Sequence, residues 1–141
     1  MGDTVVDAEF AEDGTVKSVG TQNFGNIRLY ADNFVLASGS FFSKGMIATP
    51  DRIYEPVFGV DLSYAEGRDQ WFDRNFWNKQ NYISYGAKVS KFLHASIDGK
   101  PVGNLYAIGS LIGGSNTLYE GCGGGIALLT ALAAADGILE K

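Results

Sequence analysis

The 141-residue sequence predicts an α/β fold of one domain: a β meander, two buried strands of a parallel sheet and a closing C-terminal helix. Three observations lead to this prediction. Short β-branched runs alternate with turn signals at residues 4–36, an unbroken apolar run ends in a turn of small residues at 34–40, and a glycine cluster precedes an Ala- and Leu-rich stretch at 120–138. The length allows one modest hydrophobic core.

The meander is expected over residues 4–36, where Asp13-Gly14 and Gly25-Asn26 mark the turns. Residues 34–37 (FVLA) are apolar without alternation, which is typical of a strand buried on both faces in a parallel sheet. The turn SGS at residues 38–40 follows. It lies at the strand end where open α/β sheets hold ligands.

The middle of the chain gives weaker signals. Residues 41–62 are expected to be irregular because prolines and glycines interrupt every possible helix. Residues 63–79 allow a short helix that carries the aromatic group Trp71, Phe72, Phe76 and Trp77, and such a group more often indicates packing than a ligand site. Residues 82–97 are expected to form strand and turn, and a short buried strand is expected at 105–108.

Residues 120–125 (EGCGGG) contain four glycines directly before the expected helix at 126–138. Each glycine in a helix costs about 1 kcal/mol relative to alanine, so the cluster needs a reason. One reason is a ligand, because bare N–H groups and the positive end of the helix dipole accept a phosphate or a flat ring. The other is close packing against a neighbouring strand. Glycines 109, 113 and 114 in the preceding loop favour the ligand.

Charge and composition exclude several classes. The net charge of −5, without a run of Lys or Arg, argues against a nucleic-acid partner. The single cysteine, Cys122, cannot form an intramolecular disulfide and suggests neither a metal site nor an oxidising compartment, so we expect a cytoplasmic location. No apolar run reaches the roughly 20 residues of a membrane-spanning helix.

Five segments together carry a resemblance to a known family: VLASGS (35–40), FFSKG (41–45), EPVFG (55–59), YAIGS (106–110) and EGCGGG (120–125). They resemble the C-terminal part of the B-type flavoprotein subunits of anaerobic glycerol-3-phosphate dehydrogenase, a family within the wider group of two-dinucleotide-motif flavoproteins. The resemblance implies a partial flavoprotein fold, with residues 1–141 as one domain of a larger flavin-binding subunit. The family's N-terminal glycine-rich turn, which binds the flavin phosphate, has no counterpart in this sequence.

The resemblance also implies a function. The family oxidises sn-glycerol 3-phosphate to dihydroxyacetone phosphate and passes electrons to quinone in anaerobic respiration. The implied cofactor is FMN, with FAD as the alternative, in a site that this chain completes only in part. The implied partners are a flavin-bearing catalytic subunit and an iron–sulfur subunit that holds the complex at the inner face of the cell membrane. We expect the isolated chain to be inactive and to self-associate through open strand edges or a bared apolar face.

Two other functions stay open: a fragment of a fumarate-reductase-like flavoprotein, and a non-catalytic electron-transfer or assembly module. The catalytic residue is not identified by the sequence. The cofactor-binding residues that the resemblance implies border two strand ends and the helix start: Gly39, Ser40, Gly109, Ser110, Leu111, Gly121, Cys122, Gly123, Gly124 and Gly125.

Five side chains are weaker candidates. Cys122, near a helix start, could be a reactive thiol, although a small side chain that fits is the commoner case. His94 is the only histidine and could carry a proton or bind phosphate. Lys44, Arg52 and Arg68 could pair with a substrate phosphate, although solvated surface charges are commoner.

Overall fold

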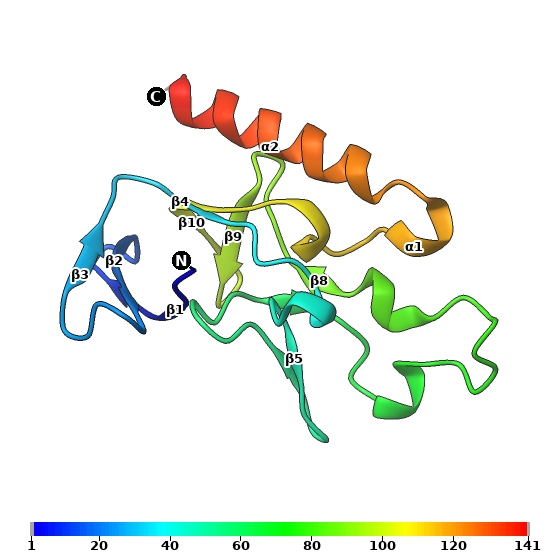
Figure 1. The fold of residues 1–141 in the computed structure, drawn as a ribbon. Coiled ribbons are helices and arrows are strands. Elements are labelled where there is room, and N and C mark those ends of the chain that lie inside the picture. Colours follow the sequence, from blue (N-terminus) through cyan, green and yellow to red (C-terminus); the bar gives the residue numbers. More distant parts are fainter. Residues whose placement is uncertain (1, 141) are drawn as a thin grey trace.

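Two three-stranded sheets form the framework of the computed structural model, which describes residues 2–140 (Figure 1). The first is an antiparallel meander of β1 (Val5–Phe10), β2 (Val16–Thr21) and β3 (Arg28–Tyr30). Gly14, with a φ of 82°, and Gly25, with a φ of 57°, take the left-handed conformation in the two turns. The predicted meander is therefore confirmed.

The second sheet has β10 (Lys100–Ala107) at its centre. β4 (Phe34–Leu36) pairs with it in parallel and β9 (His94–Ile97) pairs antiparallel, so the predicted parallel pairing is confirmed. The burial prediction is wrong for one strand. Val35 in β4 is 47% exposed, whereas Tyr106 opposite it in β10 is fully buried. Among the described residues β4 is an edge strand, and its outer edge has no strand partner.

The middle of the chain is mostly irregular, as expected. It contains the short pair β5 (Ile47–Ala48) and β6 (Ile53–Tyr54), and a second pair in which β7 (Leu62–Ser63) joins β8 (Gly86–Ala87). Single 3-10 turns lie at Phe41–Ser43, Arg68–Gln70, Asn81–Ser84 and Gly109–Leu111.

The helix allowed at residues 63–79 is absent, and only the 3-10 turn Arg68–Gln70 forms there. Side-chain oxygens take the backbone N–H groups instead. Asp73 accepts from the N–H of Asn75 at 2.7 Å, Asn75 from that of Trp77 at 3.1 Å, and Gln80 from that of Asp73 at 3.0 Å. Such local bonds compete with the helical pattern.

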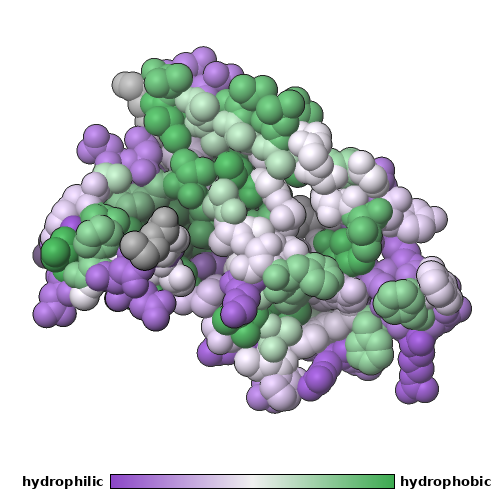
Figure 2. Space-filling view, viewed as in Figure 1, coloured by the Kyte–Doolittle hydropathy of each residue, from purple (hydrophilic) through white to green (hydrophobic). Residues whose placement is uncertain are grey.

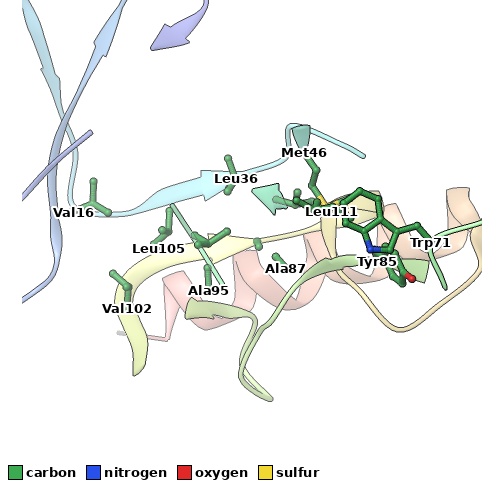
Figure 3. Packing of buried hydrophobic residues seen from close by; sticks show 13 residues of the cluster. Val16, Leu36, Met46, Trp71, Tyr85, Ala87, Ala95, Val102, Leu105 and Leu111 are labelled. Carbon is green, nitrogen blue, oxygen red and sulfur yellow. The ribbon is translucent and has the colours of Figure 1, made fainter. Parts of the chain in front are cut away.

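The buried core joins the sheets to the irregular middle (Figure 3). Leu105 and Ala95 come from the central sheet, Val16 comes from the meander, and Trp71 and Tyr85 come from the irregular segment. Asn104 fastens the two sheets together, because its side-chain oxygen accepts from the N–H of Val16 at 2.9 Å and its amide donates to the Val16 carbonyl at 2.8 Å.

The C-terminal helix α2 (Gly123–Leu139) is confirmed, and it starts three residues before the expected position. It runs across the top of the molecule, beside the central sheet (Figure 1). Only Ala134 is buried, while the side chains of Leu128, Leu129 and Leu132 are more than half exposed. Figure 2 shows the resulting apolar band along the helix. A helix that is apolar on all sides normally lies inside a protein.

Within residues 2–140, no helix is both long enough and apolar enough to cross a bilayer. Helix α2 has 17 residues and carries Asp136 near its end.

Candidate functional site

The ends of the two parallel strands bring the first two groups of predicted residues together. β4 is followed by Gly39 and Ser40, and β10 is followed by Gly109 and Ser110. A Cβ atom added to Gly39 would lie 3.6 Å from the hydroxyl oxygen of Ser110, so the two loops are in contact. Gly39 and Gly109 have φ angles of 76° and 68°, which a residue with a side chain rarely adopts.

Two further glycines allow these loops to pack. A Cβ atom on Gly45 would lie 1.9 Å from the carbonyl oxygen of Gly39, and one on Gly86 would lie 2.3 Å from that of Leu111. Both neighbours are backbone atoms, which cannot rotate out of the way. Neither position is among the predicted site residues. The need for glycine at 45 and 86 arises only when the folded chain brings the backbone of Gly39 and Leu111 against them.

The start of α2 has the opposite environment. A Cβ atom on Gly124 or Gly125 would meet nothing within 4 Å, and one on Gly123 would meet only the Thr117 side chain at 3.7 Å. The glycines therefore do not serve packing of the helix against a strand of this chain. Gly121, with a φ of 64°, forms the turn between α1 (Thr117–Glu120) and α2.

Cys122 is the N-cap residue of α2, and its side chain makes no capping hydrogen bond. Its thiol lies 3.6 Å from a carboxylate oxygen of Glu120 instead. The first turn of α2 thus receives no side-chain acceptor from its own cap, and the first N–H groups of an α-helix have no partner within the helix.

Thr130 connects the strand-end loop to the helix. Its hydroxyl oxygen accepts from the N–H of Gly109 at 2.9 Å and donates to the carbonyl of Ile126 at 2.6 Å. This pair of bonds fixes the Gly109 loop against the first turns of α2. The sequence interpretation misses Thr130 because threonine inside an Ala- and Leu-rich helix carries no distinctive signal.

A small cavity of about 210 Å³ lies between the loops and α1. Ser40 and Ser110 line it together with Thr117. Leu111 is different from the other predicted residues, because its side chain is fully buried in the hydrophobic core.

A larger groove of about 720 Å³ runs along the open edge of β4. Val35 and Lys44 line it, as does Ser38, whose hydroxyl oxygen is buried and has no hydrogen-bond partner among residues 2–140. A buried polar atom without a partner is costly, and such an atom is usually satisfied by a water molecule, an ion or another group. Asp3 lines the same groove, where the Thr21 hydroxyl and hydrogen bonds from the backbone N–H groups of Asn23 and Thr4 hold the pKa of its carboxyl below the usual value.

The weaker candidates are scattered. The His94 ring lies edge-on to Tyr106 in the sheet, with 4.6 Å between ring centroids. The guanidinium of Arg52 lies over the ring of Tyr54 at 5.0 Å. Lys44 lines the groove along β4, whereas Arg68 lines a separate cavity. These cations do not form a common phosphate site within residues 2–140.

The sequence profile of a family described as "FAD binding domain" matches residues 1–126. The segment includes both strand-end loops, the glycine cluster and the first residues of α2. The family is named for FAD, and the match lends no support to FMN as the preferred flavin.

Proteins named as the B-type subunit of anaerobic glycerol-3-phosphate dehydrogenase are similar to nearly the whole chain. The relative from Haemophilus influenzae (strain 86-028NP) is 46% identical over 145 residues, covering 99% of this chain and 33% of the relative. The relative from Pectobacterium carotovorum (strain PC1) is 46% identical over 116 residues, and that from Vibrio vulnificus (strain CMCP6) is 39% identical over 135 residues. They cover 82% and 94% of this chain.

These matches confirm the resemblance seen in the sequence motifs. The chain spans about a third of the length of the relatives it matches. No solved structure matches it.

Proposed function

Because the chain belongs to the FAD-binding domain family, we propose that it supplies one wall of the flavin site in a flavoprotein oxidoreductase. The observation that carries the proposal is the bare start of α2. Gly124 and Gly125 have free space where side chains would be, and the helix lacks a side-chain cap. A flat ring or an anionic oxygen fits against such a surface.

The residues divide into two roles in this proposal. The N–H groups of Gly123, Gly124 and Gly125 would stabilise negative charge on a bound flavin, because they carry the positive end of the helix dipole. Ser40 and Ser110 offer hydroxyl groups from the paired strand ends, where they line a common cavity. When bound, the flavin supplies two-electron redox chemistry, and donors placed beforehand at the ring favour its reduced form.

The names of the relatives support a subunit of a multi-subunit dehydrogenase, and the substrate and the partners are proposed on that basis. We propose that the complete protein helps to oxidise sn-glycerol 3-phosphate to dihydroxyacetone phosphate, with release of two electrons and two protons. The electrons pass by way of a second flavin-bearing subunit and an iron–sulfur subunit to quinone, and the latter subunit holds the complex at the inner face of the membrane. The isolated chain lacks most of the relatives' length and is proposed to be inactive.

The test is to identify the flavin. The full-length subunit is purified, the flavin is released with acid, and its identity and stoichiometry are measured by chromatography and mass spectrometry. We expect about one FAD per polypeptide. A folded but colourless protein that leaves the absorbance spectrum of added FAD unchanged would contradict the proposal.

A further inference from the structure

A cavity of about 400 Å³ is lined largely by aromatic side chains, and none of the predicted flavin-binding residues lines it. Its lining includes the buried side chains of Ile53 and Trp71. Further aromatic rings come from Phe41, Phe72 and Tyr82. The volume falls within the range of small-molecule sites, which are usually apolar with a few polar groups.

The cavity is held open by hydrogen bonds around Trp71. The indole N–H of Trp71 donates to the carbonyl of Ala65 at 2.7 Å, and the Trp71 carbonyl accepts from the N–H of Tyr82 at 2.9 Å. The side-chain amide of Asn81 donates to the carbonyl of Gln70 at 2.9 Å. These bonds join the two segments that carry the rings, so the cavity does not need a ligand in order to form.

Apart from its aromatic residues, the lining has two polar side chains, Thr49 and Arg68, and the Thr49 hydroxyl already has hydrogen-bond partners. The hydroxyl of Thr49 lies 3.1 Å from the carbonyl oxygen and 3.2 Å from the N–H of Arg52, and bonds to both. A polyol would therefore lose its hydration without gaining enough hydrogen bonds, which makes sn-glycerol 3-phosphate a poor occupant.

Arg68 is the one cationic residue of the lining. Within residues 2–140 its guanidinium forms neither an ion pair nor a hydrogen bond. An unpaired arginine next to aromatic rings matches a ligand that combines a ring with an anionic group, because the guanidinium binds carboxylates in a bidentate manner.

We propose that this cavity binds a small planar aromatic anion, with its ring among Phe41, Trp71 and Tyr82 and its anionic group on Arg68. Edge-on and offset ring contacts supply affinity beyond the area that they bury. The rings of Phe41 and Tyr82 meet edge-on, with 6.2 Å between their centroids, so two of the aromatic rings in the lining are already packed together. The inference does not depend on the proposed flavin site.

The test uses the full-length subunit and 2-naphthoate as the probe, with binding measured by isothermal titration calorimetry. Two analogues separate the contributions: 2-naphthylmethanol lacks the charge, and cyclohexanecarboxylate lacks the aromatic ring. Arg68→Gln removes the cation, and Arg74→Gln is the matched control because Arg74 is exposed and does not line the cavity. Phe41 and Tyr82 are left unchanged because both also line the smaller cavity beside Ser110.

We expect 2-naphthoate to bind saturably and more tightly than either analogue. Arg68→Gln should weaken it by about 10-fold, to the level of 2-naphthylmethanol, while Arg74→Gln has no effect and the FAD content stays the same in both variants. The proposal is overturned if 2-naphthoate shows no saturable binding, if cyclohexanecarboxylate binds equally well, or if Arg68→Gln and Arg74→Gln bind 2-naphthoate alike. Unchanged FAD content separates its failure from failure of the flavin site.

Discussion

Replacement of Gly124 by valine separates a ligand surface from a packing surface. Apart from the helix's own nearby backbone, no atom of residues 2–140 lies within 4 Å of the added Cβ atom, so the Cβ atom creates no clash with them. Valine is also a better helix former than glycine, by about 0.3 kcal/mol. The free energy of unfolding should therefore stay the same or rise slightly.

Flavin binding should respond in the opposite direction. A ring in contact with the bare helix start would have to move away from the new side chain, and overpacking of this kind costs about 1–3 kcal/mol. That cost corresponds to a rise of about 5- to 150-fold in the Kd for FAD. The assay is titration of the flavin-free full-length subunit with FAD, followed by flavin fluorescence, alongside urea unfolding of the same samples.

The matched control is Gly103→Val. Gly103 lies on β10, where an added Cβ atom also meets nothing within 4 Å, and it is outside the predicted site. This variant should keep wild-type FAD affinity. The reasoning is refuted if Gly124→Val binds FAD as tightly as Gly103→Val, or if Gly124→Val unfolds in less urea than the wild type, since the second result would show that Gly124 serves packing.

Three other outcomes are expected. Thr130→Val should weaken FAD binding, because the Gly109 N–H loses its acceptor, and Thr130→Ser should restore it; equal weakening in both variants would exclude the hydroxyl as the cause. Gly86→Ala should lower the free energy of unfolding by about 1–3 kcal/mol, measured against Gly103→Ala, because its Cβ atom would meet backbone 2.3 Å away. The isolated 141-residue chain should self-associate in light scattering, and Leu129→Glu on the exposed face of α2 should reduce this; a monomer at high concentration would count against it.

The regular elements could be predicted from the sequence because each has a local signal. The turn glycines at 14 and 25 mark the meander, the apolar run at residues 34–37 marks β4, and the Ala- and Leu-rich run marks α2. These signals act over a few residues and do not depend on how the chain folds back on itself.

The two failures have different causes. Residues 63–79 have the composition of a short helix, but the acceptors on Asp73 and Gln80 take the backbone N–H groups. Val35 is apolar like its neighbours, but its exposure depends on what pairs with the outer edge of β4. The first outcome is set by local side-chain hydrogen bonds that compete with the helix, and the second by a contact from outside the segment.

The sequence predicts which glycines could face a ligand, but only some of the residues that hold the site together. The sequence indicates the glycines at 123–125 through their lack of side chains, and the structure adds that the space beside two of them is open. Gly45, Gly86 and Thr130 act by holding the loops together, and their roles depend on partners that lie elsewhere in the fold.

A structure of the full-length subunit with its flavin would show whether the flavin ring lies against the start of α2. The measurement is the distance from the isoalloxazine ring to the Cα atoms of Gly124 and Gly125. We expect a distance of about 4 Å, with the ring or its oxygens in contact with the first turn of α2. Polypeptide filling that space, with the flavin elsewhere, would contradict it.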